Sequence, residues 1–239
     1  MSNIILNDIA FGNHERQKVD IYIPKTAKSP CGLILYIHGG GWQEGDKSGH
    51  KPDCEYFCNL GYITAAMNYR FVSEEISIFD ELDDISSALI KIKSELKTYG
   101  FELDKVILSG GSAGAHLALM YAYTRNEETP VIPVAVCAYC PPVYCSKPDF
   151  LLGISGEFES WKYEILSKCA SIKISKETYL NVEQQAALKK MSPAYYVHKN
   201  CVPTAVFHGK NDELIPMAHI DLFLRKLKNQ HTKNESVIE

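Results

Sequence analysis

The sequence predicts an α/β fold with a mostly parallel central sheet and helices on both faces. Apolar runs of strand length alternate with helical stretches along the chain, which is typical of such a sheet. The run at residues 33–37 is apolar throughout, as expected of a strand buried on both sides. The 239 residues are 46% hydrophobic and 23% charged, which suits one large α/β domain. We therefore expect a single domain over residues 1–239.

The expected strands are short and rich in apolar and β-branched residues. They lie at residues 19–23, 33–37, 62–67, 105–108, 131–138 and 204–207. Residues 236–239 look like the first residues of one more strand, so the final strand is expected to be incomplete.

Helical spacing separates these strands. Apolar positions three or four residues apart predict an amphipathic helix at about 78–99, closed by Gly100, and further helices are expected at 113–123 and 216–228. Between 141 and 190 the rhythm breaks, and aromatic residues, prolines and glycines mix with helical pieces. We interpret this segment as a cap-like or lid-like insertion over the sheet, because no linker-like stretch isolates it.

Charge and hydropathy exclude several kinds of partner. The formal net charge is −4 with interspersed charges and a pI near 6.1, so we expect no nucleic-acid partner. The N-terminus lacks a basic region followed by a long apolar run, and no stretch approaches the roughly 18 apolar residues of a membrane helix. We expect a cytoplasmic protein with no membrane partner. The sequence leaves open whether the chain forms a homo-oligomer.

The eight cysteines are expected to be free, half-buried thiols, since nothing in the sequence predicts secretion. Cys137 and Cys140 have the C-x-x-C spacing of a redox or zinc pair. However, the pair ends an apolar run, precedes two prolines and has no second pair at zinc-finger spacing. We therefore expect no metal and no cofactor.

A G-x-S-x-G pattern lies at residues 110–114, with Ser112 at its centre. An apolar strand precedes it and an apolar helix follows, which is the setting of a nucleophile elbow. A turn from strand to helix in so few residues strains the backbone at the serine and projects its hydroxyl away from the sheet. The alternative is a glycine-rich loop with an incidental serine; the matching flanks favour the nucleophile.

Residues 38–42 read His-Gly-Gly-Gly-Trp and follow a strand buried on both sides. Successive glycines let a backbone approach a bound molecule and aim its N–H groups inward. The N–H groups of Gly40, Gly41 and Ala113 are expected to receive the negative charge of a tetrahedral intermediate. A phosphate-binding loop is disfavoured, because neither G-x-G-x-x-G nor a Walker-type lysine is present. His38 is expected to brace the loop.

Asp212 lies in the turn that follows the strand at 204–207, after Ser112 in the chain. A serine followed by an acid is the order of a Ser-Asp-His triad on this kind of fold. Glu213 and Asp221 are competitors, but we interpret them as a solvated neighbour and a helix-surface charge.

The histidine of such a triad is expected after the next helix and strand, where the sequence ends. His231 follows that helix but precedes the strand, and it is the only in-chain candidate by position. The remaining histidines have no positional claim: His14, His38, His50, His116, His198, His208 and His219. Loss of the base of a serine triad can cost on the order of a million-fold in turnover. We therefore expect either a C-terminally shortened hydrolase or a hydrolase-fold protein without normal activity.

Together these segments resemble the α/β-hydrolase superfamily, in its esterase/lipase branch with an His-Gly-Gly-Gly oxyanion loop, and most of all acetyl- and feruloyl-esterase-like carboxylesterases. The matching segments fall in the family's order: residues 38–42, Asn68-Tyr69-Arg70, residues 110–117, Ser192-Pro193 and residues 208–216.

The resemblance implies roles for five residues. Ser112 would be the nucleophile, Asp212 the triad acid, and Gly40, Gly41 and Ala113 the oxyanion donors. The sequence departs from hormone-sensitive-lipase-like members, which carry an acidic residue before the serine and Leu-Ala-Pro-Glu after the segment that corresponds to residues 69–70.

The implied activity is cleavage of small carboxylic esters through an acyl-enzyme. An amidase or peptidase with the same machinery, and a catalytically impaired binding protein, are the rivals. The insertion supplies aromatic side chains that form a lid over Ser112 or pack the insertion onto the sheet: Tyr139, Tyr144, Phe150, Phe158, Trp161 and Tyr163.

Overall fold

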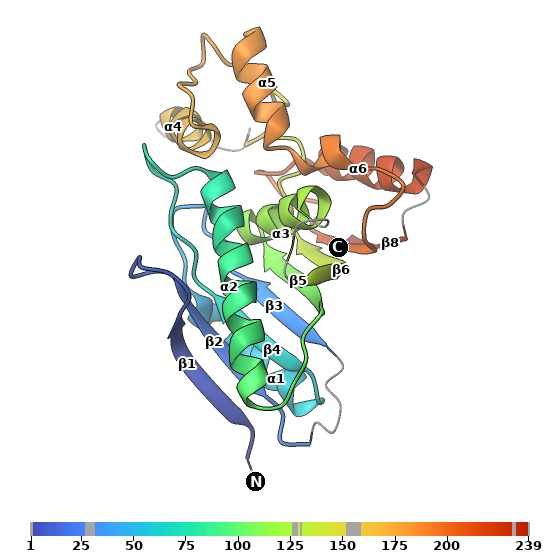
Figure 1. Ribbon diagram of the computed structural model, residues 1–239. Coiled ribbons are helices and arrows are strands. Elements are labelled where there is room, and N and C mark those ends of the chain that lie inside the picture. Colours follow the sequence, from blue (N-terminus) through green and yellow to red (C-terminus); the bar gives the residue numbers. More distant parts are fainter. Residues whose placement is uncertain are drawn as a thin grey trace.

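The structure is a computed structural model that describes residues 2–26, 32–125, 129, 131–151, 159–230 and 233–238. Its strands form one sheet in the order β1-β2-β4-β3-β5-β6-β7-β8 (Figure 1). The strands are β1 (Ile4–Ala10), β2 (Lys18–Ile23), β3 (Leu33–Ile37), β4 (Ile63–Met67), β5 (Lys105–Gly111), β6 (Ile132–Tyr139), β7 (Thr204–His208) and β8 (Asn234–Ile238).

The sheet is mostly parallel. Neighbours from β4 through β3, β5, β6 and β7 to β8 pair in parallel, while β1 and β2 join at one edge by antiparallel pairing. Parallel neighbours need crossover connections, and helices supply most of them. The helices in the described ranges are α1 (Lys51–Asn59), α2 (Ile78–Thr98), α3 (Ala113–Thr124), α4 (Glu159–Ala170), α5 (Val182–Lys190) and α6 (Met217–Asn229), with short 3-10 helices η1 (Lys47–His50) and η3 (Pro193–Tyr196).

Each face of the sheet has its own apolar core. Leu35 and Ile37 of β3 pack with α2 and α3, whereas Tyr36 between them packs with Cys54 and Cys58 of α1. Figure 1 shows α2 in front of the sheet and α1 behind it. The structure thus confirms the prediction of a parallel α/β sheet with helices on both faces.

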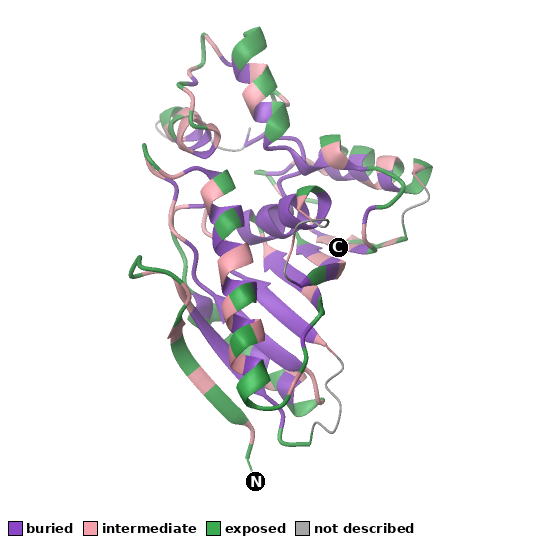
Figure 2. Cartoon of the chain, in the orientation of Figure 1, coloured by how far each residue is buried: buried purple, intermediate pink, exposed green. Residues whose placement is uncertain are grey.

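The helix α3 is the most buried of the described helices. Residues Ala113 to Tyr123 are all buried, and α3 appears almost wholly in the buried colour in Figure 2. An apolar helix of this kind is expected in the centre of a domain. Its burial fixes the position of the turn from which it begins.

The helix α2 begins at a capping box, in which Ser77 accepts from Phe79 N–H and Asp80 accepts from Ser77 N–H. Asp84, one turn further along, is buried and pairs with Arg70 at 2.8 Å. Asp84 therefore holds the segment that follows β4 against α2.

Several elements differ from the sequence prediction. β1 and α1 were not expected from their patterns, and α4 was not distinguished within the insertion. β8 begins at Asn234, earlier than expected, and pairs with β7 from Thr204 to His208. α4 and α5 lie side by side at the end of the molecule where α2 begins (Figure 1). No helix formed by the described residues has the length and apolar character to cross a membrane.

Candidate active site

Ser112 lies at the sharp turn between β5 and α3. Its backbone has φ 50° and ψ −117°, a left-handed conformation that residues with a Cβ rarely adopt. The Ser112 N–H donates to the carbonyl of Tyr139 at 2.8 Å, and its carbonyl accepts from His116 N–H at 3.0 Å. The residue is exposed although α3 behind it is buried. The turn therefore presents a hydroxyl to solvent from a rigid base.

Gly114, two residues after Ser112, lets the start of α3 approach the end of β3 closely. A Cβ on Gly114 would collide with the backbone oxygens of Ile37 and His38 at the end of β3. Only glycine lets α3 begin so close to the neighbouring strand. The G-x-S-x-G pattern is thus explained by packing as well as by the bend.

The loop formed by residues 38–42, here called the glycine loop, lies beside Ser112. Ile37, at the end of β3, pairs with Gly110 of β5, so the two chain segments that follow start side by side. A Cβ placed on Gly39 would lie 2.7 Å from the Gly111 oxygen and 3.5 Å from the Ser112 Cβ. Gly40 has φ 117°, and a Cβ there would meet the backbone of Glu44.

His38 fixes the peptide that leads into Gly40. It is buried, and burial lowers its pKa to about 4, so the ring is neutral at pH 7. Its Nδ1 lies 2.7 Å from the Gly39 oxygen, which can only accept, so Nδ1 carries the proton. Its Nε2 is then an acceptor and receives a hydrogen bond from Arg16 Nη2 at 3.2 Å.

This arrangement sets the direction of one expected oxyanion donor. In a planar trans peptide the C=O and the following N–H point in opposite directions. Because the Gly39 oxygen is held by His38, the Gly40 N–H points away from that imidazole. The brace expected of His38 therefore acts on the peptide whose N–H is the expected donor.

Arg16 is a functional candidate that the sequence did not reveal. Its Nε donates to the Tyr69 oxygen at 2.9 Å, its Nη2 also donates to the Gly45 oxygen at 3.1 Å, and its guanidinium lies 3.6 Å above the Phe71 ring. Arg16 comes from the connection between β1 and β2, and no local motif marked it.

Two tryptophans help to position the glycine loop: Trp42, its last residue, and Trp161 of α4. Trp42 is buried and its Nε1 donates to His116 Nδ1 at 3.1 Å, which ties the loop to α3. His116 in turn donates from Nε2 to the Met191 oxygen at 2.6 Å, and burial lowers its pKa to about 4. Trp161 of α4 lies 3.3 Å from the position of a Cβ on Gly41. The insertion thus reaches the loop beside Ser112.

Asp212 lies in the turn after β7, as expected. Its Oδ1 accepts from the N–H groups of Leu214 at 2.9 Å and Ile215 at 2.8 Å. These bonds fix one carboxylate oxygen and leave Oδ2 for another partner. Glu213 and Asp221 are exposed, as the interpretation of both as solvated charges requires.

Among the described residues, no histidine ring is found hydrogen bonded to the side chain of Asp212 or Ser112. The nearest is His208, whose Nε2 lies 4.0 Å from Asp212 Oδ2 but 3.0 Å from the Ile215 oxygen. His219 pairs with Asp149 at 2.8 Å. His231, the in-chain candidate, lies outside the described residues.

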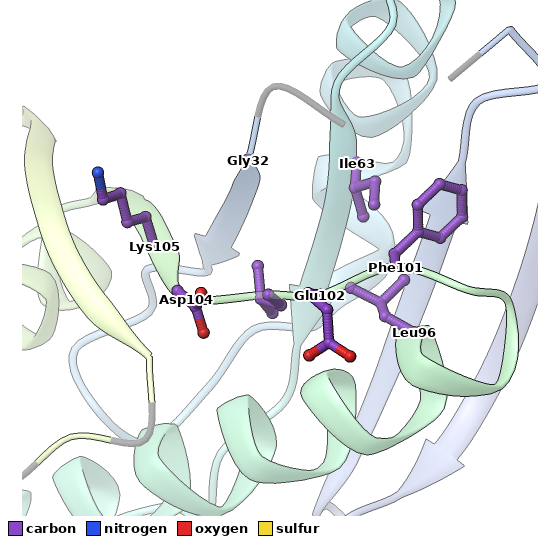
Figure 3. A pocket seen from close by; sticks show the side chains of 8 residues that line it. Gly32, Ile63, Leu96, Phe101, Glu102, Asp104 and Lys105 are labelled. Atoms are coloured by element: carbon purple, nitrogen blue, oxygen red, sulfur yellow. The ribbon is translucent and has the colours of Figure 1, made fainter. Parts of the chain in front are cut away.

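Figure 3 shows a pocket that is distinct from this site. It has a volume of about 210 Å³ and is lined by Ile63, Leu96, Phe101 and Lys105 among others. Lys105 begins β5, whereas Ser112 follows the last residue of β5. This pocket therefore lies at the opposite end of the strands from Ser112. It is also smaller than the roughly 300 Å³ at which ligand pockets usually begin.

The parallel sheet, the serine at a strand-to-helix bend and the glycine loop from the neighbouring strand define an α/β-hydrolase fold of the esterase branch. The chain belongs to the BD-FAE family, whose model matches residues 19–227.

Curated relatives match along nearly the whole chain. A probable carboxylic ester hydrolase, LipM of Mycobacterium tuberculosis, is 26% identical over 92% of this chain and 51% of its own length. A probable isoprenylcysteine alpha-carbonyl methylesterase of Arabidopsis thaliana is 25% identical over 99% of this chain and 50% of its own length. The chain thus spans about half the length of these relatives.

Solved structures share the fold. Esterase B from Lactobacillus rhamnosis superposes with a TM-score of 0.78 at 22% identity, covering 99% of this chain and 74% of that one. A truncated carbohydrate esterase from gut microbiota gives a TM-score of 0.80 at 18% identity, covering 98% of this chain and 87% of that one.

Proposed function

We propose that the chain carries the nucleophile and oxyanion part of a serine hydrolase that cleaves small carboxylic esters. One observation carries this proposal: the exposed hydroxyl of Ser112, at a strained bend, lies against the glycine loop. The names of the relatives support an ester rather than an amide substrate. An amidase with the same machinery is the alternative that a substrate panel tests.

The proposed reaction is a two-step acyl transfer. Ser112 Oγ attacks the ester carbonyl, the alcohol leaves, and water then releases the acid from the acyl-enzyme. The N–H groups of Gly40, Gly41 and Ala113 hold the oxyanion, and the start of α3 adds the positive end of its dipole. Removal of one such donor typically costs on the order of 3 kcal/mol in the transition state.

An imidazole between Ser112 and Asp212 would move the proton in this mechanism. Asp212 Oδ2 would orient its N–H, because Oδ1 is already held by two backbone donors. The described histidines are engaged elsewhere. We propose that the base acts near the carboxyl ends of β7 and β8, where His208 pairs with Ile238 and the turn that carries Asp212 follows β7.

Rescue by free imidazole tests this assignment. We expect slow hydrolysis of p-nitrophenyl acetate by the 239-residue chain, and an increase with added imidazole beyond the reaction in buffer. Ser112→Ala should remove the increase. Ser171→Ala is the matched control, because Ser171 is an exposed serine with φ 50° that lies outside the site.

Two outcomes would contradict the proposal. An imidazole-dependent increase that survives Ser112→Ala would exclude Ser112 as the nucleophile. Fast turnover without imidazole that persists after His231→Ala would show that one of the described residues acts as the base.

We also propose that the insertion at about 141–190 acts as a lid, with α4 as the part that meets the substrate. Trp161 supports this role because its ring lies 3.3 Å from the position that a Cβ on Gly41 would take. Trp161→Ala should change the relative rates on acetyl and longer acyl esters, while Tyr163→Ala on the same helix should leave them unchanged. Equal acyl preferences in all three proteins would end the lid proposal.

A further inference from the structure

Three side chains of different ligand chemistry meet where β6 and β7 end. Cys140 follows β6, His208 is the last residue of β7, and Asp212 lies in the turn after it. β6 and β7 are parallel neighbours, and the Cys140 N–H donates to the Phe207 oxygen at 2.8 Å. One ligand atom from each of the three residues lies within 4.8 Å of the other two.

The hydrogen bonds of the three residues define what a metal would displace. Asp212 Oδ1 is occupied by backbone donors, Oδ2 lies 4.0 Å from His208 Nε2, and the Cys140 side chain hydrogen bonds to the Asp212 carboxylate. The His208 side chain is 0% exposed. Its Nε2, the nitrogen that lies nearest Asp212, donates to the Ile215 oxygen, and its Nδ1 has no partner within the described ranges. Metal binding at Nε2 would therefore release the Ile215 oxygen and move the proton to Nδ1. An imidazole with one protonated nitrogen keeps a lone pair on the other, and burial of that lone pair without a partner is costly.

We propose that Cys140, His208 and Asp212 form a binding site for Zn²⁺ or a similar thiolate-preferring divalent cation. Thiolate, imidazole and carboxylate are the three ligand types of zinc in proteins. Mg²⁺ and Ca²⁺ prefer oxygen ligands and fit this set poorly. On binding, the Cys140 S–H bond breaks, its electron pair forms the bond to the metal, and the proton leaves to solvent.

The geometry needs only a small closure. Zinc bonds of about 2.0–2.3 Å in a tetrahedral site put ligand atoms roughly 3.3–3.6 Å apart. The three atoms would therefore move together by about 1 Å, and a water would fill the fourth position. The site joins Cys140 to residues of the next strand and not to Cys137, so it departs from the sequence expectation of no metal.

Metal at this site has a regulatory consequence that rests on the proposed function. The cation would occupy Asp212 Oδ2, the oxygen that would otherwise orient the catalytic imidazole. Zn²⁺ should therefore inhibit imidazole-dependent ester hydrolysis. The binding itself does not depend on Ser112.

Titration of the metal-stripped 239-residue chain with Co²⁺ tests the site without an activity assay. A cobalt–thiolate bond gives a near-ultraviolet charge-transfer band, and four-coordinate Co²⁺ gives intense visible bands. We expect both bands to saturate at one Co²⁺ per chain, to disappear when Zn²⁺ is added, and to form equally in Ser112→Ala. Cys140→Ser should abolish the charge-transfer band, and Asp212→Asn should weaken binding at least tenfold.

Cys137→Ser is the matched control, because Cys137 is a half-buried thiol of β6, the strand that Cys140 follows. It should bind Co²⁺ like the wild type. Absence of a charge-transfer band in the wild-type chain, or a band that survives Cys140→Ser, would overturn the proposal. Failure of the proposed hydrolase would appear separately, as inert Ser112 in a chain that still binds cobalt.

Discussion

Ser112 carries the main backbone strain of the site. A non-glycine residue in such a conformation costs on the order of 1–3 kcal/mol and persists only where its surroundings fix it. Here the surroundings are the hydrogen bonds of Ser112 to Tyr139 and His116, and the buried helix that follows. The strain is the consequence of pointing a hydroxyl outward from a strand-to-helix turn.

Ser112→Gly should therefore stabilise the fold, although it removes the nucleophile. We expect the free energy of unfolding to rise by about 1 kcal/mol over Ser112→Ala, since relief of strain exceeds the entropy cost of glycine. Urea unfolding of the two variants measures the difference. A glycine variant no more stable than the alanine variant would show that the bend is not strained.

Glu81 is a second residue that lowers the stability of the fold, because its carboxyl group is buried. It is 0% exposed on α2, neither carboxylate oxygen has a partner within the described ranges, and burial raises its pKa well above the usual value. A raised folded pKa gives stability that is present below the unfolded pKa, near 4.5, and lost as pH rises.

Glu81→Gln should remove this loss. The variant and the wild type should be similarly stable near pH 4, and the variant should gain by up to about 1.4 kcal/mol per pH unit above that, until Glu81 ionises in the fold. Denaturant unfolding at several pH values provides the test. A constant difference between the two proteins from pH 4 to pH 8 would contradict a buried neutral Glu81.

At the scale of elements, the glycine loop is held by parts of the chain that are distant in sequence. Arg16 reaches it from the β1–β2 connection, and His116 of α3 accepts a hydrogen bond from Trp42 in the loop. The Trp161 ring of α4 lies 3.3 Å from the position of a Cβ on Gly41. Glycines give the loop its path but cannot hold it there, because they have no side chain. Preorganised donors need such support to act on a transition state.

Arg16→Gln should loosen the Gly39–Gly40 peptide. We expect imidazole-dependent kcat on p-nitrophenyl acetate to fall about tenfold at similar KM, which corresponds to about 1.4 kcal/mol. Arg125→Gln, which removes a guanidinium from a surface ion pair with Asp83, serves as the control. Equal kcat values in Arg16→Gln and Arg125→Gln would show that Arg16 does not support the glycine loop.

For the whole molecule, buried histidines make stability depend on pH. Burial lowers the pKa of His38 and His116 to about 4, below the usual value of 6.5. Between these values the unfolded chain binds protons that the folded chain refuses, so stability falls as pH decreases. Each histidine should cost about 2 kcal/mol at pH 5 relative to neutral pH.

Urea unfolding between pH 7 and pH 5 checks this slope. The test uses the Glu81→Gln background, because ionisation of Glu81 gives a slope of opposite sign in this pH range. In that background we expect the free energy of unfolding to decrease by several kcal/mol, and a further His116→Gln change should flatten the curve by about half. A flat profile in the Glu81→Gln chain would mean that these rings are not held neutral.

The sequence predicted the parts of the fold that follow from local pattern. Apolar periodicity located the strands β2 to β7 and the helix α2, and the two glycine motifs located Ser112 and the loop beside it. β1 escaped because most of its residues are exposed, and α1 escaped because its buried face is only Cys54 and Cys58. Such weakly apolar elements form because tertiary neighbours support them.

Contacts between distant elements could not be predicted in this way. The Arg16–His38 hydrogen bond joins the β1–β2 connection to the end of β3, and the Cys140–Asp212 pair joins the ends of two strands. Only the sheet order brings these residues together. The catalytic roles, the single-domain boundaries with their insertion, the cytoplasmic location and the oligomeric state stay predictions.

The central claim is that Ser112 faces main-chain N–H groups able to hold an oxyanion. A crystal structure of the chain after reaction with a small-alkyl fluorophosphonate in the presence of imidazole, which supplies the base, tests it most directly. We expect phosphorus on Ser112 Oγ, with its oxygen about 2.7–3.1 Å from the nitrogens of Gly40, Gly41 and Ala113. An adduct on another residue, or a phosphonyl oxygen that points to solvent away from these nitrogens, would contradict the claim.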